Sequence, residues 1–292
     1  MDGSYGAAEQ LGSTVVRVLA PNPSPMTHRG TCTYVLGEGA GRAVIDPGPP
    51  DAAHMEAVLG ACSGARVEAI LVTHAHLDHS PGAALLAART GAPVLGWRFD
   101  RGRSETMQAL AGIGGGEGVD RAFAPDREPA DGERIEGDGW AVRAHWTPGH
   151  MASHLSFETP DGDVLSGDVA MGWASTMISP PDGDVAQFLG SMDRLAALGA
   201  RRFLPGHGEP VEAPAERCRD LRAHRLAREA AILAALDGGT TIPDLVARVY
   251  VDTPPALHPA AARNVLAHLI RLAETGAATA DRLAPDGRFR RA

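Results

Sequence analysis

Four side chains that can bind metals fall within six consecutive residues of this sequence. His74, His76, Asp78 and His79 follow the pattern H-x-H-x-D-H, directly after the apolar run 69–72. That run has the composition of a buried strand, so the polar side chains are expected on the turn at its C-terminal end. Neutral imidazoles and carboxylates are donors that zinc prefers. A histidine-rich surface loop is the alternative, but four donors this close together favour a metal site.

Three more candidate donors recur later in the chain. His150, Asp168 and His207 each end or follow a short apolar segment, and each stands in or beside a turn that contains Gly or Pro. Any one of them alone would more often be an ordinary turn residue. Strand ends that converge at one sheet edge are where sites are built in layered α/β folds. The recurrence therefore predicts one site shared by several strand ends.

Short strands and helices alternate through the first two thirds of the chain. The expected strands are residues 14–19, 33–36, 43–45, 69–72, 140–144, 164–168 and 202–204, and the expected helices are 51–62, 81–90 and 184–197. Residues 98–138 show little periodicity. We expect them to form long connections that cover one face and contribute to the rim of the site.

The last 79 residues have a different character. An arginine-bearing amphipathic helix is expected over 215–236, and Thr241 with Asp244 forms a capping-box pattern that opens a second helix. A third helix carries apolar residues at helical spacing and ends at Gly276. Residues 277–290 are expected to form a short two-stranded wing. These patterns are consistent with a winged-helix-like module.

The donor pattern resembles that of the metallo-β-lactamase-fold hydrolases. The H-x-H-x-D-H run, with Asp46 before it and His150, Asp168 and His207 after it, follows the order of the family's motifs over residues 14–213. Residues 257–259 and 263–269 are similar to the tail of the lactamase-β-2-like subgroup. The resemblance implies an α/β fold, a four-layer αββα sandwich in residues 1–213, followed by a small winged-helix-like domain in 214–292.

The resemblance also implies a dinuclear metal site. Seven side chains would supply ligands in two sets that share one carboxylate: His74, His76 and His150 for the first ion, Asp78, His79 and His207 for the second, and Asp168 between them. Two zinc ions, with iron or manganese as alternatives, would share a water and lower its pKa, so that a bridging hydroxide is the nucleophile. Asp78 would also be catalytic, by orienting the nucleophile or carrying a proton. Asp46 would fix the ligand turn without binding metal.

Other residues near the motifs have less specific roles. His154 is either an outer partner of the site or an ordinary polar contact, and His28, His54 and His145 are expected to be solvated or structural. Trp173, Ser175, Thr176 and the turn 180–184 follow Asp168 and are expected to border the substrate channel, with plain packing an equal alternative for the Trp. Cys32 departs from the resemblance, because relatives commonly carry Asn there.

Composition limits the classes of function. The 292 residues carry a net charge of −9, which argues against a surface that coats nucleic acid, although residues 214–292 alone have a net charge of +3. The three cysteines are scattered and indicate neither a disulfide framework nor a cysteine metal site. A secretory leader and a membrane-length apolar run are both missing from the sequence, so a cytoplasmic location is expected.

The leading interpretation is a zinc-dependent hydrolase of an ester, thioester or lactone, acting on a small-molecule or acyl-carrier substrate. One alternative is an endoribonuclease or phosphodiesterase that grips phosphates with the arginines of the first tail helix: Arg217, Arg219, Arg222, Arg225 and Arg228. Another is a tail that reads DNA or mediates dimerisation. The sequence leaves the RNA partner and the homo-oligomer open, and it does not favour β-lactams as substrates.

Overall fold

Two β-sheets packed face to face form the centre of the molecule. The structure is a computed structural model that describes residues 4–292. The first sheet contains, in order, β1 (Ala8–Gln10), β2 (Val15–Leu19), β3 (Cys32–Leu36), β4 (Gly41–Ile45), β5 (Arg66–Leu71) and β6 (Val94–Leu95). The second contains, in order, β11 (Arg202–Pro205), β10 (Asp163–Gly167), β9 (Leu155–Glu158), β8 (Trp140–Trp146) and β7 (Arg134–Gly137).

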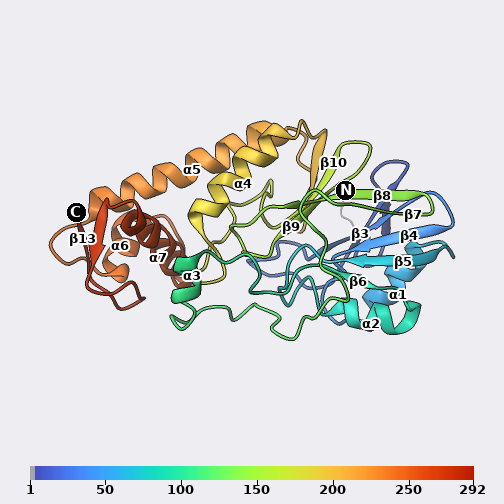
Figure 1. Ribbon diagram of the computed structural model, residues 1–292, viewed down its shortest axis with the longest axis horizontal. Helices are drawn as coiled ribbons and strands as arrows, with labels where there is room; N and C mark the ends of the chain where they lie inside the picture. Colours follow the sequence, from blue (N-terminus) through green and yellow to red (C-terminus); the bar gives the residue numbers. More distant parts are fainter. Residues whose placement is uncertain (1–3) are drawn as a thin grey trace.

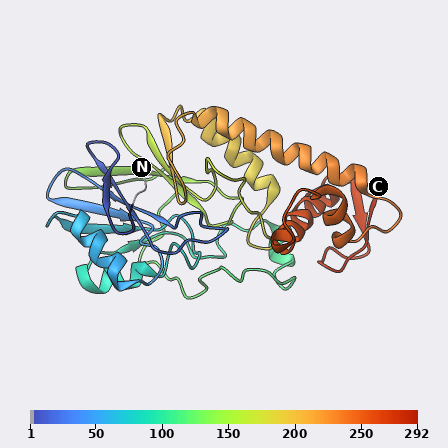
Figure 2. The ribbon, with the colours of Figure 1, turned by 180° about the vertical axis from the view of Figure 1, so that it is seen from behind.

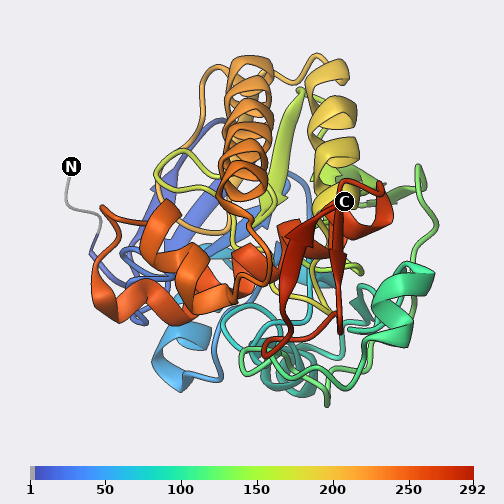
Figure 3. The same ribbon diagram turned by 90° about the vertical axis from the view of Figure 1, so that its left-hand side faces the viewer.

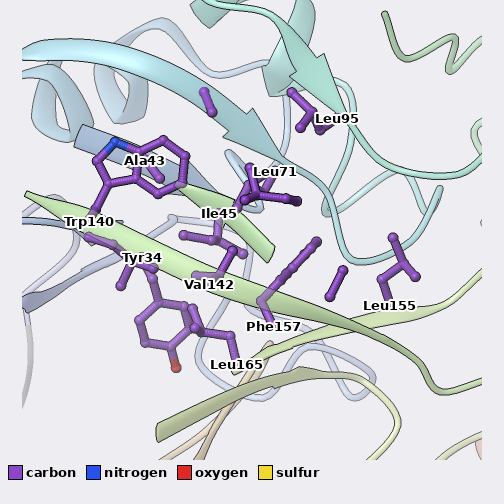
Figure 4. Packing of buried hydrophobic residues seen from close by; sticks show 14 of the residues in the cluster. Tyr34, Ala43, Ile45, Leu71, Leu95, Trp140, Val142, Leu155, Phe157 and Leu165 are labelled. Carbon is purple, nitrogen blue, oxygen red and sulfur yellow. The ribbon is translucent and has the colours of Figure 1, made fainter. Parts of the chain in front are cut away.

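The side chains between the sheets come from alternate strand positions. Figure 4 shows Tyr34 and Ile45 of the first sheet packed with Phe157 and Leu165 of the second. Successive strand residues point to opposite faces, so their neighbours, such as Val44, pack on the outer side instead. Both faces of the central strands are therefore buried, which is why these segments are almost continuously apolar.

Helices cover the outer face of each sheet. On the first sheet lie α1 (Ala52–Ala61) and α2 (Gly82–Thr90), and on the second lie α4 (Val185–Ala197) and α5 (Pro214–Ala235) (Figures 1 and 2). Asp51 and Asp184 cap the N-termini of α1 and α4 through their carboxylates. The result is the four-layer αββα sandwich that the sequence predicted.

The tail is a small three-helix unit with a hairpin. It contains the end of α5, then α6 (Ile242–Val249), a 3₁₀ turn (Pro255–Leu257), α7 (His258–Glu274), β12 (Ala278–Ala280) and β13 (Phe289–Arg291). The capping box of Thr241 and Asp244 is present as predicted. The antiparallel pair β12–β13 is the expected wing (Figure 3).

Helix α5 belongs to two hydrophobic cores. Cys218 and Leu221 near its start pack with α4 of the sandwich, whereas Ile232 near its end packs with α6 and α7. Figure 3 shows α4 and α5 side by side, with the tail at the end of α5. A domain boundary between residues 213 and 214 therefore remains a proposal, because the helix that starts there is shared.

Several short elements were not anticipated. Residues 98–138 contain α3 (Glu105–Ala109) as well as β7, and β1, β6 and β9 are strands of two to four residues. Segments this short show too little periodicity to be recognised from sequence. The three cysteines are buried and unpaired. Within residues 4–292 the structure has no helix that is long and apolar enough to cross a membrane.

Candidate metal centre

The seven candidate donors meet at one edge of the sandwich. Each of them follows the end of β5, β8, β10 or β11. Two backbone hydrogen bonds join the sheets at this edge: Leu155 N donates to Thr73 O at 2.8 Å, and Cys32 N donates to Gly206 O at 2.8 Å. The turns that carry the donors are thereby drawn together, and the donor atoms form two groups.

The first group is a set of three imidazoles. His76 Nδ1 lies 2.9 Å from His74 Nε2 and 3.0 Å from His150 Nε2. His150 uses its Nδ1–H to donate to Met177 O at 2.7 Å, so a neutral ring presents a lone pair at Nε2. Thr73 has the same effect on His74: its hydroxyl donates to Asp46, so it accepts the Nδ1–H of His74.

Two nitrogen lone pairs therefore face the single atom His76 Nδ1. A proton on His76 Nδ1 can form a hydrogen bond to only one of these two lone pairs. The other lone pair is left without a hydrogen-bond donor. Neutral imidazoles with convergent lone pairs are what a zinc-like cation requires. The donor chemistry of the first group fits a metal ion.

The second group combines two imidazoles with two carboxylates. His207 Nε2 lies 3.1 Å from Asp78 Oδ2 and 3.3 Å from His79 Nε2. Both rings point Nε2 inward because their Nδ1–H groups are used elsewhere, by Gly30 O at 3.1 Å for His207 and by Asp46 Oδ2 at 2.9 Å for His79. Even with both rings protonated, their two Nε2–H groups face three carboxylate oxygens, Oδ2 of Asp78 and both oxygens of Asp168.

Asp168 lies between the two groups. Its Oδ2 is 3.3 Å from His207 Nε2 and 3.8 Å from His150 Nε2, and its Oδ1 is 3.5 Å from His79 Nε2. Oδ1 is buried and has no hydrogen-bond partner among the described residues. A carboxylate placed this way can serve cations in both groups.

The pKa values of the histidines are lowered in the first group and raised in the second. Burial, with repulsion from His150, lowers the pKa of His76 to about 3, and burial also lowers those of His74 and His150. In the second group burial opposes protonation, but the Asp168 carboxylate outweighs it and raises the pKa of His207 to about 9. Burial raises the pKa of Asp168 in turn, yet His207 and His79 bring it well below its ordinary value.

Asp46 holds the ligand turn from behind. Its carboxylate accepts from Thr73 N at 2.7 Å, from Thr73 Oγ1 at 2.7 Å and from His79 Nδ1 at 2.9 Å. It is buried and adopts a φ of 48°, in the left-handed region. The carboxylate therefore sets the tautomer of His79 directly and that of His74 through Thr73, which is the outer role expected from the sequence.

His154 is an outer partner of Asp168. Its Nε2 accepts from Asp168 N at 3.2 Å, and its Nδ1 lies 3.0 Å from Thr147 Oγ1. With Nε2 occupied by an amide, the ring has no lone pair for a metal. Of the two alternatives that the sequence left open, the structure favours support of the site.

The residues expected at the lip differ in exposure. Trp173 is 37% exposed and its ring lies 4.9 Å from that of His28, beside the donor turn at Gly208. Thr176 is buried and donates to Asp168 O at 2.9 Å. The turn 180–184 is buried, caps α4 through Asp184 and pairs with Arg103 through Asp182, and its place at the channel stays a prediction.

The two partners that orient His74 and His150 could not be predicted from the sequence. Thr73 acts through a hydroxyl whose role depends on Asp46, 27 residues earlier. Met177 acts through its main-chain carbonyl, so its side chain carries no signal. His145 and His54 are structural, as expected: His145 Nε2 lies 2.8 Å from Glu158, and His54 is buried against Thr33.

Known proteins match both parts of the chain. A family model described as "Metallo-beta-lactamase superfamily" matches residues 27–207, and one described as "Beta-lactamase associated winged helix domain" matches residues 241–284. A "Beta-lactamase-like protein 2 homolog" from Drosophila melanogaster is 32% identical over 277 residues, which cover 92% of this chain and 91% of that protein.

Two further relatives add a named activity and a solved structure. An "Atrochrysone carboxyl ACP thioesterase" from Aspergillus fumigatus is 29% identical over 231 residues, or 77% of this chain and 66% of that protein. A metallo-beta-lactamase family protein from Thermus thermophilus has a TM-score of 0.78 at 28% identity, covering 97% of this chain and 100% of that one. The likeness extends through the tail.

Replacing Asp46 with Asn is expected to weaken metal binding at the second group by about 10–100-fold, the usual effect of losing an outer partner of a metal-binding His. The side-chain nitrogen of Asn would point its N–H groups at His79 Nδ1–H or at Thr73. Both of these already donate hydrogen bonds to Asp46, so two donors would face each other and the hydrogen bond would be lost. Competition with a chromophoric zinc chelator measures the change. Asp51→Asn is the matched control, because Asn also caps a helix well. Unchanged affinity in Asp46→Asn would contradict the assigned role.

His54 gives a prediction for stability. It donates Nε2–H to Thr33 Oγ1 at 2.8 Å, its Nδ1 is buried without a partner among the described residues, and burial lowers its pKa to about 4. The unfolded chain binds this proton from about pH 6.5 downward. The metal-free protein should therefore lose free energy of unfolding between pH 6.5 and 4, by roughly 1.4 kcal/mol for each unit of the pKa shift.

The His54→Gln variant isolates this contribution, since Gln keeps a donor for Thr33 but does not titrate. Urea denaturation of both proteins, with chelator present, should show the difference in free energy of unfolding moving in favour of the variant as the pH falls. A difference that stays constant from pH 7 to pH 4 would rule out the contribution of His54.

Proposed function

The chain belongs to the metallo-beta-lactamase superfamily, and we propose that it is a dinuclear metal-dependent hydrolase of thioesters and related activated esters and lactones. One observation carries the proposal: two groups of inward-facing acceptor atoms share the carboxylate of Asp168, whose Oδ1 has no hydrogen-bond partner among the described residues. Too few N–H groups face these acceptors to satisfy them all by hydrogen bonds, whereas bound metal cations would satisfy them.

The proposed ligands are the seven donors of the two groups. His74, His76 and His150 would hold the first ion, Asp78, His79 and His207 the second, and Asp168 both. When bound, two such ions supply Lewis-acid polarisation of the scissile carbonyl and a water of lowered pKa. Zinc suits this mixture of nitrogen and oxygen donors, and iron and manganese are accepted by the same types of ligand.

Asp78 is the group best placed to move a proton. Its side chain is 27% exposed, whereas those of His79 and His207 are almost fully buried. Both of its contacts, with His79 and His207, use Oδ2. Oδ1 is therefore the oxygen that would orient a water molecule or accept its proton.

The leaving group argues for a thioester. A thiol has a pKa of about 8.5, so a thiolate departs near neutral pH without a strong proton donor, unlike an alkoxide or amine. Among the proposed ligands, Asp78 is the carboxylate that is partly exposed. Burial raises its pKa, but its neighbours His79 and His207 keep that pKa well below its ordinary value, so it is a poor proton donor to a leaving group. The thioesterase from Aspergillus fumigatus, whose printed name specifies an acyl carrier protein, supports the same class. The exposed pair of Trp173 and His28 offers apolar surface for an acyl group.

The arginines of α5 do not support the ribonuclease alternative. Arg217 donates to main-chain carbonyls of the lip, Arg222 pairs with Asp193, and Arg228 donates to Val249 O. Arg225 is buried. Arg219 is the one of the five that is exposed and has no hydrogen bond or ion pair among the described residues, and a single such cation is poorly suited to gripping a phosphate backbone.

The tail also offers little to the DNA alternative. Helix α7 is the third helix of the winged-helix unit, which is the position of the groove-reading helix in such modules. From Ala261 to Ala273 none of its residues is exposed. Because α7 has no exposed face over this stretch, it cannot enter a major groove in this conformation. A cytoplasmic location remains a proposal from the sequence.

Replacing His76 with Ala should lower the metal content of the purified protein and reduce kcat/KM for an acyl-N-acetylcysteamine thioester by more than about 100-fold, because losing a ligand exceeds the effect of losing an outer partner. Chelation should abolish the wild-type activity. Restoring it with zinc, iron or manganese separately identifies the metal that the enzyme uses.

A second histidine variant serves as the control. His258→Ala removes a tail histidine that hydrogen-bonds to Thr253 O and belongs to neither group of donors, so metal content and activity should stay at the wild-type level. If His76→Ala retains both metal and hydrolysis, the proposed site is wrong. If the metal-loaded protein cleaves RNA or phosphodiesters but no thioester, ester or lactone, the proposed substrate class is wrong.

A further inference from the structure

Residues 171–180, here called the strap, run from just beyond Asp168 towards α4 without regular secondary structure. The main-chain groups of such a segment need partners from elsewhere, since buried backbone N–H and C=O groups are nearly always paired. One anchor lies within the site, where Thr176 Oγ1 donates to Asp168 O at 2.9 Å. The other anchors come from the tail helices α5 and α7.

Two arginines, one at the start of α5 and one on α7, hold the ends of the strap. Arg217 of α5 donates to Met171 O at 2.7 Å and to Ala174 O at 2.8 Å. At the other end, Arg263 of α7 donates to the carbonyl of Pro180. The same arginine donates to Gly114 O at 2.8 Å, so it also ties the strap to the glycine-rich connection 112–118.

The middle of the strap orients a proposed ligand. Met177 O accepts the Nδ1–H of His150 at 2.7 Å, and the next residue, Ile178, is fully buried. Asn264 of α7 accepts the N–H of Ile178 through Oδ1 at 3.2 Å. The carbonyl of Met177 is thus held on one side by Thr176 and on the other by the tail.

Asn264 is itself held firmly. Its Oδ1 also accepts from Arg225 Nη1 at 2.9 Å, and its Nδ2 donates to Ala260 O at 3.2 Å. Nε and Nη2 of Arg225 are buried and have no hydrogen-bond partner among the described residues, and burial lowers its pKa to about 10. Burying the Arg225 guanidinium is costly unless its N–H groups have acceptors. Its hydrogen bond to Asn264 Oδ1 therefore favours keeping that oxygen in place.

We propose that Asn264 is a positioning residue of the metal centre, which fixes the strap and, through the carbonyl of Met177, the imidazole of His150. The inference rests on the proposed function, in which His150 is a ligand of the first ion. An outer hydrogen bond to Nδ1 fixes the ring orientation and tautomer of a metal-binding His. The tail is then part of the site rather than an attachment to it.

Three variants in the full-length protein test the inference. Asn264→Leu removes the acceptor at similar volume, and Asn264→Asp keeps an oxygen for Ile178 N and adds a charge opposite Arg225. Val265→Ala, at the fully buried neighbouring position in the tail core, lowers stability without touching the strap. The measurements are zinc affinity by chelator competition, with His150→Ala marking the affinity of the first group, and hydrogen exchange of the strap in zinc-free protein.

Asn264→Leu should weaken zinc binding at the first group by about tenfold, leave the second group within about twofold, and speed exchange in the strap. Asn264→Asp should restore both properties. Val265→Ala should lower Tm while leaving zinc affinities and strap exchange at the wild-type level.

The inference is overturned if the strap of zinc-free Asn264→Leu exchanges as in wild type, or if Val265→Ala at equal loss of Tm reproduces the loss of zinc affinity. Wild-type protein that binds no zinc, iron or manganese would defeat the proposed function instead. In that case exchange of the strap in the metal-free variants still decides whether Asn264 orders it.

Discussion

The carboxylate of Asp46 is the constraint on which the rest of the site depends. It accepts three hydrogen bonds from two residues of the ligand turn, and it does so while fully buried. Through His79 it sets the direction of the second group of donors, and through Thr73 and His74 that of the first. A single buried anion thus determines which nitrogen atoms of His79 and His74 face the centre, whereas the carbonyls of Met177 and Gly30 do so for His150 and His207. One imidazole of each group therefore depends on this acceptor.

The sandwich places this anion where it can act. Parallel pairing of β4 with β5 puts Asp46, which follows β4, beside the turn that follows β5. Parallel pairing of β10 with β11 does the same for Asp168 and His207 in the other sheet. The apolar layer between the sheets, with Tyr34 and Phe157 buried in it, fixes the separation of these two edges. The packing that forms the core therefore also brings the turns that carry the metal ligands together.

The features that could be predicted from sequence are those with a local signal. The turn with the H-x-H-x-D-H run, the short apolar strands and the capping box at Thr241 each depend on residues a few positions apart, and all are present in the structure. Contacts between distant segments could not be predicted. The arginines of α5 looked like a solvated or phosphate-binding face, but Arg225 is buried because Asn264 on α7 accepts from it. The hydrogen bond from His150 to Met177 involves a main-chain oxygen, which no side-chain pattern reveals.

The sharing of α5 between two cores limits how the molecule can move. A helix of 22 residues is about 33 Å long, and here its first half is packed in the sandwich and its second half in the tail. Rotation of the tail as a rigid lid would require α5 to bend or to leave one of its cores. Changes of shape at the site are then confined to short loops. The glycine-rich connection 112–118 touches both Arg263 and the ligand turn, and its glycines give it more backbone freedom than a helix has.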